Sequence, residues 1–213
     1  MSLTSLRRAK PIESDSIDLF TDLPENNVRL LSIEYQKATP LCEEYPYERQ
    51  SIYYGELEYD ESSNYGHDRT ISIRFKFRLD SNLFILSTEV DFKIGDLITE
   101  LNSLSSDRFR IYRGLIPNRQ QLWGFFRNSD GLIEMTIINE EGKEVEVGTI
   151  EESVAGISGE YPIESATAIF EFDNQNIVVR YTNGSINIDS KDPEANEYII
   201  QLFERDVISR NTE

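Results

Sequence analysis

The sequence predicts an α+β protein in which antiparallel β-hairpins form a meander and a few helices pack on one face, the last of them an amphipathic C-terminal helix. Two patterns support this class. Residues 70–79 alternate between apolar and polar side chains, which is the period of a strand with one buried face. Residues 195–207 repeat apolar side chains every three or four positions, after an Asp192-Pro193 pair that is typical of a helix start.

The first part of the chain carries mainly strand patterns, separated by polar turns and prolines. The turn Asp80-Ser81-Asn82 follows strand 70–79, so the next apolar stretch is expected to pair back with it as a hairpin. Asp96 is a suitable helix cap, because the leucines and isoleucine that follow it fall on one side of a helix. The expected elements are strands at 28–35, 52–59, 70–79, 83–90 and 108–112 and helices at 96–104 and 118–131.

The last third of the chain predicts two hairpins and a helix. Residues 132–138 and 143–147 flank a polar turn, and residues 165–172 and 177–181 form the second pair. Asn183-Gly184 is a type I′ turn signal, which leads to a further short strand. The C-terminal helix then begins after Asp192, with its buried face marked by Ala195, Tyr198, Ile199, Leu202 and Phe203.

Three parts are expected along the chain. Residues 1–26 are polar and predict a mobile or loosely docked tail, whose Arg7-Arg8-Ala9-Lys10 cluster is either solvated or docked on an acidic surface. Residues 27–128 predict a β-rich module with a basic and aromatic surface. Residues 129–213 predict an acidic meander with the C-terminal helix, either as a second domain or as part of one domain with 27–128.

Charge is distributed unevenly in this acidic chain. The sequence has 21 Lys and Arg against 39 Asp and Glu, a net charge of −18. Residues 69–128 run against this trend, since their basic residues outnumber their acidic ones. The net charge disfavours non-specific binding of nucleic acid or anionic membrane by the surface as a whole. Two interpretations stay open: the acidic charge is a salt-adapted solubility device, or the segregation of charge serves binding.

Several kinds of chemistry lack their motifs. A single cysteine, Cys42, excludes an internal disulfide, and the glutamates beside it predict a raised thiol pKa. His67 lies in an acidic loop that is better read as a solvated turn than as a metal site. No phosphate loop, dinucleotide fingerprint or Gly-x-Ser-x-Gly elbow is present, so no metal, cofactor or catalytic residue is predicted. The absence of an 18-residue apolar run and of an apolar N-terminal segment leads us to expect a cytoplasmic protein without a membrane span.

The candidate binding residues come from the basic middle of the chain. Arginine interleaved with aromatic residues suits protein interfaces, and also suits phosphate pairing and base stacking. The alternative is that the aromatic residues belong to the core and the arginines pair with carboxylates of the same chain. The candidates, expected to form one basic surface, are Arg74, Lys76, Arg78, Arg108, Arg110, Arg113, Arg119, Trp123 and Arg127.

The function favoured by the sequence is that of a non-enzymatic binding or accessory protein that contacts a protein partner through this surface, with nucleic acid as a less favoured partner. A second hypothesis is an acidic decoy that mimics nucleic acid, because Glu140, Glu141, Glu144, Glu146, Glu151 and Glu152 are closely spaced. A third is an enzyme with a carboxylate site that no spacing identifies. The sequence gives no indication of the oligomeric state.

Overall fold

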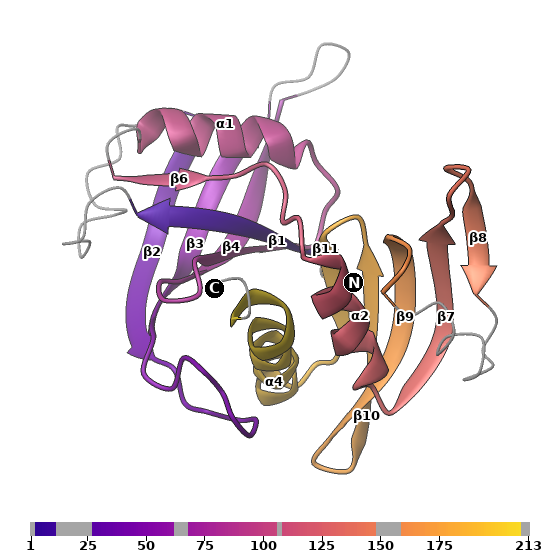
Figure 1. The fold of residues 1–213 in the computed structure, drawn as a ribbon. Coiled ribbons are helices and arrows are strands. Elements are labelled where there is room, and N and C mark those ends of the chain that lie inside the picture. The colour runs from indigo at the N-terminus through magenta and orange to yellow at the C-terminus, as the bar shows by residue number, and fades with distance from the viewer. Residues whose placement is uncertain (1–2, 12–26, 62–67, 106–107, 148–158, 210–213) are drawn as a thin grey trace. The chain divides into compact units, whose positions relative to one another are not determined.

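The computed structural model describes residues 3–11, 27–61, 68–105, 108–147 and 159–209 (Figure 1). Antiparallel strands dominate it, and the described residues include three α-helices, one of them near the C-terminus. The expected α+β class, with mostly antiparallel strands and a few helices, is therefore confirmed. The chain divides into two compact units: unit 1 comprises Met1–Ala38 and Arg49–Leu115, and unit 2 comprises Thr39–Glu48 and Ile116–Glu213.

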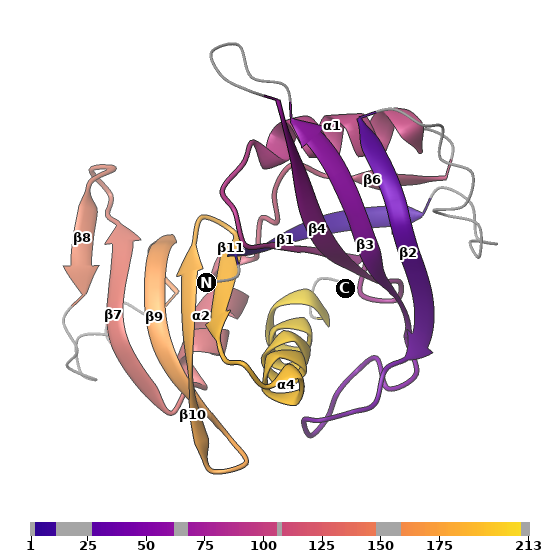
Figure 2. The ribbon, with the colours of Figure 1, turned by 180° about the vertical axis from the view of Figure 1, so that it is seen from behind.

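Unit 1 is a curved antiparallel sheet with one helix (Figure 2). Its strands follow the order β2-β3-β4-β5-β1, and β6 pairs with β1 off this path. The elements are β1 (Leu3–Pro11), β2 (Val28–Lys37), β3 (Ser51–Glu61), β4 (Arg69–Arg78), β5 (Leu83–Thr88), α1 (Ile94–Leu104) and β6 (Phe109–Ile111).

Strand β1 lies within the segment 1–26 that was expected to be a mobile or loosely docked tail, and its residues 3–11 are paired in the sheet. Residues 3–8 pair with β5, and residues 9–11 pair with β6. Leu6 and Ala9 are buried, at 2% and 0% exposure. Leu6 and Ala9 are three positions apart and point to opposite faces, so they give no strand periodicity in the sequence. The partner strands β5 and β6 lie far away along the chain, so local sequence does not reveal the pairing. Residues 12–26 of the expected tail lie outside the described residues.

The core of unit 1 lies between α1 and one face of the sheet. The apolar residues of β4 that were expected to share a face are all buried there, together with Leu97, Ile98 and Leu101 of α1. Asp96 lies inside α1 and is not its cap, because the helix begins at Ile94. The opposite face of β4 alternates outward as predicted until Arg78, which is 0% exposed.

Glycine 55 allows a close approach between β2 and β3. The register between these strands shifts between Leu30 and Ser32, so Leu31 is the extra residue of a β-bulge. A Cβ atom at position 55 would lie 2.1 Å from the Ser32 carbonyl oxygen. Only glycine fits beneath the bulge at this distance.

Unit 2 contains five antiparallel strands and two α-helices among its described residues. Its strands follow the order β11-β10-β9-β7-β8. Asp173 and Asn174, and then Asn183 and Gly184, have positive φ angles in the two hairpin turns, which confirms the predicted type I′ turn at Asn183-Gly184. The elements are α2 (Arg119–Arg127), β7 (Gly131–Ile138), β8 (Glu144–Val147), β9 (Ile163–Phe172), β10 (Gln175–Thr182), β11 (Ser185–Asp189), α4 (Pro193–Phe203) and the π-helix η2 (Glu204–Ile208).

The C-terminal helix begins and packs as predicted. The Asp192 carboxylate accepts a hydrogen bond from the Glu194 N–H at 2.9 Å, and Pro193 occupies the first helical position. Phe203 of α4 and Phe170 of β9 both contact the ring of Phe125 in α2, at centroid distances of 5.4 and 4.9 Å. The aromatic residues of both helices therefore join one core with the sheet of unit 2.

Residues 39–48, which connect β2 to β3, belong to unit 2. The Gln201 carboxamide accepts a hydrogen bond from the Leu41 N–H and donates one to the Thr39 carbonyl, both at 2.8 Å. The Tyr45 hydroxyl donates to the carboxylate of Glu204, which is fully buried, at 2.5 Å. The unit boundary thus differs from the break expected near residues 128–131, because these contacts connect residues far apart in the sequence.

Candidate binding surface

The outer face of the unit 1 sheet, opposite α1, has balanced charge over β2, β3 and β4. The strand register places Glu56 opposite Arg74 and Tyr54 opposite Lys76. Beside them, Arg29 forms ion pairs with Glu58 at 2.9 Å and with Asp60 at 2.7 Å. Exposed pairs of this kind stabilise a fold only slightly. The carboxylates of β3 nevertheless offset the cations that the sequence assigned to an open basic surface.

A buried strip interrupts the outer face of this sheet. Leu83 and Ile85 of β5 point to the same face as Lys76 and Arg78, yet they are 0% and 2% exposed. Arg78 is itself fully buried and therefore contributes no exposed charge, contrary to the prediction. This buried strip on β5 therefore separates the exposed Arg74 of β4 from the cations on β1 and β6.

The predicted residues 119–127 belong to unit 2. Trp123 is 1% exposed, and its indole Nε1 donates to the Tyr161 carbonyl at 2.8 Å, so it is a core residue. Arg119 is exposed and donates from Nη1 to the Glu160 carbonyl at 2.6 Å. Arg127 is exposed at the end of α2. For Trp123 the alternative of a core aromatic residue is correct.

Strands β1 and β6 bring together basic side chains from two distant parts of the chain. Their antiparallel register pairs Ala9 with Ile111 and Lys10 with Arg110. The Tyr112 N–H continues the pairing by donating to the Arg8 carbonyl at 2.8 Å. Because side chains alternate across a strand, Ala9 and Ile111 enter the core while Lys10 and Arg110 share the opposite face. We call residues 8, 10, 108, 110 and 112, together with Arg113 in the bend that follows β6, the basic ribbon.

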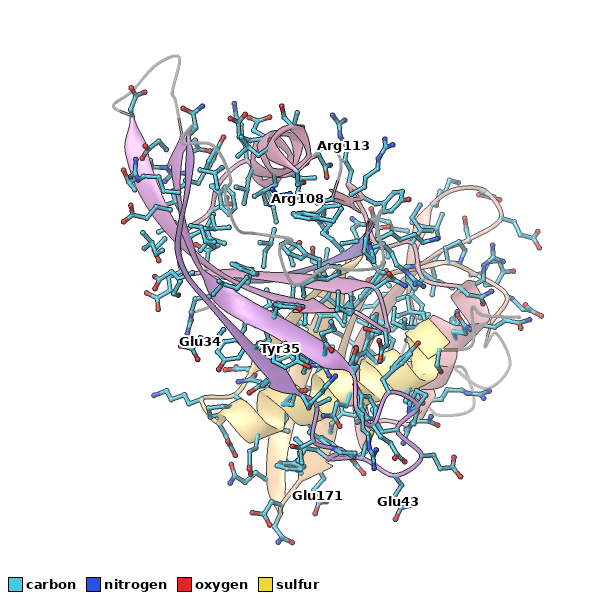
Figure 3. All side chains as sticks on the ribbon, turned by 90° about the vertical axis from the view of Figure 1, so that its left-hand side faces the viewer. Glu34, Tyr35, Glu43, Arg108, Arg113 and Glu171 are labelled. Atoms are coloured by element: carbon cyan, nitrogen blue, oxygen red, sulfur yellow. The ribbon has the colours of Figure 1, made fainter. Side chains whose placement is uncertain are left out.

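The basic ribbon is exposed and rich in cations. Lys10, Arg110, Tyr112 and Arg113 are exposed, while Arg8 and Arg108 are half-buried. The Arg110 guanidinium carbon lies 6.0 Å from the centroid of the Tyr112 ring, within cation–π range. Segments 3–11 and 108–113 contain no Asp or Glu. Figure 3 labels Arg108 and Arg113 at the end of unit 1 that carries α1.

Side chains from the end of α1 occupy the backbone edge of β6. The Asn102 carboxamide donates to the Ile111 carbonyl at 2.8 Å and accepts from the Ile111 N–H at 2.7 Å. The Ser105 hydroxyl approaches the Phe109 carbonyl at 3.3 Å. An added strand would have to displace these bonds. The basic ribbon therefore offers its side chains to a ligand, not its backbone edge.

The sequence interpretation identified only part of this site. Arg108, Arg110 and Arg113 are among the predicted binding residues, whereas Arg8 and Lys10 lie in the predicted tail and Tyr112 is not among the candidates. A usable signal was present, because Arg8 and Lys10 are two residues apart, which is the spacing of one strand face.

Two carboxylates of unit 1, those of Asp60 and Glu61, are engaged in local bonds. The pKa of Asp60 is lowered by the hydrogen bond from the Thr70 hydroxyl at 2.6 Å and by Arg29. The pKa of Glu61 is lowered by the Lys93 N–H at 3.0 Å and by Arg69. In the described parts of the chain, no three His, Cys, Asp or Glu side chains are grouped as a metal site would require. His67 lies outside those parts.

Cys42 has a raised thiol pKa, in the direction that the sequence predicts, but the main cause differs. Burial raises the pKa most, with Asp206 and Glu204 adding to it and Arg205 opposing it. The adjacent Glu43 and Glu44 are exposed and are not among these causes. A thiol with a raised pKa is a weak nucleophile at neutral pH.

Unit 2 carries an acidic ribbon of similar construction, which we define as Glu134, Glu144 and Glu146. Glu146 lies opposite Thr136 in the β7–β8 pair, and Glu134 lies opposite Thr167 of β9, so all three glutamates share the face that points away from Met135 and Val147. All three are exposed. Glu140 and Glu141 lie in the turn of the same hairpin. Glu151 and Glu152 of the predicted cluster lie outside the described residues.

Two sequence comparisons were made between this chain and known proteins, and neither gives a match. No protein-family model matches it, and no curated protein is similar to it in sequence. Within the described residues, each helix is too short or too polar to cross a membrane.

Proposed function

We propose that this chain is a non-enzymatic binding protein that uses the basic ribbon of unit 1 to hold an acidic segment of a protein partner. The observation that supports this most is the β1–β6 register, with exposed Lys10 opposite exposed Arg110. Arginine pairs with carboxylates through two parallel hydrogen bonds, and Arg and Tyr are enriched at protein interfaces. Tyr112 supplies a rigid apolar surface beside these charges.

The length of the ribbon favours a short partner segment. Strand β6 has three residues, Phe109–Ile111, and spans about 10 Å at about 3.3 Å per residue. Charges beyond about 10 Å are largely screened at 0.1 M salt, so a short acidic segment interacts mainly with the ribbon. Double-stranded DNA carries a charge every ~1.7 Å along its axis, and a long duplex would extend beyond the ribbon along a protein of net charge −18. An acidic protein segment is therefore the better match.

The test is binding of two labelled probes, a twelve-residue glutamate-rich peptide and a twelve-nucleotide single-stranded DNA, at 0.15 M salt. We expect the peptide to bind more tightly than the DNA, and the triple variant Lys10→Glu, Arg110→Glu, Arg113→Glu to lose peptide binding at least tenfold. A matched control is Arg49→Glu, Lys143→Glu, Lys191→Glu, which makes the same change of charge at exposed sites outside the ribbon. Equal binding by both triple variants, or tighter binding of DNA, would reject the proposal.

The acidic ribbon supports a second candidate function, a decoy for a nucleic-acid-binding protein. Glu144 and Glu146 lie about 7 Å apart on one strand face, which is about the rise along the helix axis over two phosphates of a DNA strand. Binding of a labelled twelve-residue lysine-rich peptide tests this function. We expect Glu134→Lys, Glu144→Lys, Glu146→Lys to abolish that binding, and retention of it by the triple variant would exclude the acidic ribbon as the site.

A further inference from the structure

Strand β2 forms one edge of the unit 1 sheet. It is ten residues long and ends the strand order, and no strand of the described residues pairs with its outer side. Leu31 and Tyr35 on this strand are 52% and 51% exposed. A long edge strand with exposed apolar side chains is a template for pairing with another chain.

Two hydrogen bonds show which backbone groups of β2 face outward. The Ala38 N–H donates to the Gln50 carbonyl at 2.9 Å, and the Asp60 N–H donates to the Asn27 carbonyl at 2.7 Å. Hydrogen-bonded and non-bonded pairs alternate along antiparallel strands. Counting every second residue inward from Ala38 and from Asn27 therefore gives the residues of β2 whose backbone groups bond to β3. The remaining residues direct their N–H and carbonyl groups to the open edge: Val28, Leu30, Ile33, Tyr35 and Lys37.

The bulge at Leu31 determines how such an edge can be matched. It separates the outward-facing Leu30 and Ile33 by three positions, whereas a regular strand repeats every two. A regular partner strand would therefore lose its register at the bulge. A second copy of β2, running antiparallel, carries the same irregularity and can meet it at the same place.

We propose that β2 pairs antiparallel with β2 of a second copy, around a two-fold axis between Leu31 and Ser32. In this register Leu30 lies opposite the partner's Ile33, so outward-facing backbone groups meet each other on both sides of the bulge. Val28 likewise lies opposite the partner's Tyr35. The contact is isologous, because each pair occurs twice by symmetry.

The side chains in this register are complementary. Val28, Leu30, Ile33 and Tyr35 lie on the face of the sheet that carries the core, so apolar residues oppose apolar residues there. On the outer face, Arg29 lies opposite the partner's Glu34. Glu34 accepts a hydrogen bond from Tyr54 at 2.6 Å, which holds it extended on that face. Figure 3 labels Glu34 and Tyr35, which project from opposite faces of β2.

The decisive test is a charge exchange followed by sedimentation over a range of protein concentrations. We expect the unaltered chain to dimerise, and Arg29→Glu or Glu34→Arg alone to raise the dimer Kd at least tenfold, because like charges then meet twice across the axis. An equimolar mixture of the two variants should restore a dimer, since each supplies the charge that the other lacks. An unaltered chain that stays monomeric up to 0.2 mM, or a mixture without heterodimer, would overturn the proposal.

Arg29 also forms ion pairs with Glu58 and Asp60 within its own chain, so its substitution can alter the strand locally. A second pair of variants therefore tests the pairing without changing Arg29. Tyr35→Pro removes one outward-facing N–H, and proline is tolerated on an edge strand. Tyr35→Ala removes the same side chain and keeps the N–H. With the fold verified by circular dichroism, we expect Tyr35→Pro to be monomeric and Tyr35→Ala to dimerise; equal association of both would contradict backbone pairing at this edge.

Discussion

The basic ribbon of unit 1 and the acidic ribbon of unit 2 have similar construction and opposite charge. In each, neighbouring antiparallel strands place apolar side chains toward a core and polar ones on the other face. Glu144 and Glu146 are neighbours on a single strand, so the sequence alone groups them. Lys10 and Arg110 meet only through strand pairing between distant segments. The net charge of the chain therefore does not indicate where charged side chains gather on its surface. The register between paired strands does indicate it.

The backbone edges of these two ribbons are also protected differently. Side chains at the end of α1 bond the edge of β6, whereas β8 is only four residues long and carries two glutamates. Short length and charge both discourage edge pairing. Strand β2 is longer, at ten residues, and its charges have both signs, with Arg29 and Lys37 beside Glu34. Its bulge therefore discourages pairing with a regular strand, whereas its charges can be matched by a strand of complementary charge.

The largest effect is expected in the core of unit 2. Leu202 of α4 is 6% exposed, so Leu202→Ala should lower the free energy of unfolding by about 2–5 kcal/mol. Glu194→Gln on the exposed side of the same helix should change it by less than about 0.5 kcal/mol. Urea unfolding measures both. A loss below about 0.5 kcal/mol for Leu202→Ala would mean that α4 does not pack as described.

A smaller effect is expected at the bulge of unit 1. Gly55→Ala forces a Cβ against the Ser32 backbone and should destabilise the protein by about 1–3 kcal/mol. Gly124→Ala in α2 is the matched control with the opposite expected sign, because nothing lies within 4 Å of the Cβ position of residue 124. Alanine is the better helix former, so this variant should gain about 0.5–1 kcal/mol. Equal urea midpoints for the two variants would contradict the bulge geometry.

Acid should weaken unit 1 through Asp60 and Glu61. Both have a pKa lowered in the folded state, so their contribution is complete above the unfolded value of about 4 and is lost as the pH falls through the folded value. Asp60→Asn should therefore reduce the loss of stability between pH 7 and pH 3, as followed by urea midpoints. An unchanged pH profile in this variant would show that the Thr70 and Arg29 bonds have no net effect.

The sequence predicts the local features of this fold well. The alternation in β4, the type I′ turn at Asn183-Gly184 and the Asp192 cap depend on neighbouring residues only. Strand β1 and the docking of residues 39–48 depend on distant partners, which no local pattern reveals. Trp123 shows the same limit for the site, because an aromatic residue among arginines fits both a core and an interface.

The smallest effect on stability is expected at the basic ribbon itself. Lys10→Glu, Arg110→Glu, Arg113→Glu should change the free energy of unfolding by no more than about 0.5 kcal/mol, the usual range for surface substitutions. Thermal or urea unfolding measures this. A loss above about 2 kcal/mol would show that these charges stabilise the fold, and the binding function proposed for them would then lose its basis.

The most direct measurement of the central claim is a double-mutant cycle on Lys10→Glu and Arg110→Glu, with affinity for the glutamate-rich peptide as the readout. If the two strands form one site, both single variants weaken binding and their effects are coupled by at least about 0.5 kcal/mol, as expected for neighbouring residues. Effects that add within about 0.3 kcal/mol are typical of independent positions. Additive effects, or a single variant that binds as tightly as the unaltered protein, would contradict a shared β1–β6 binding surface.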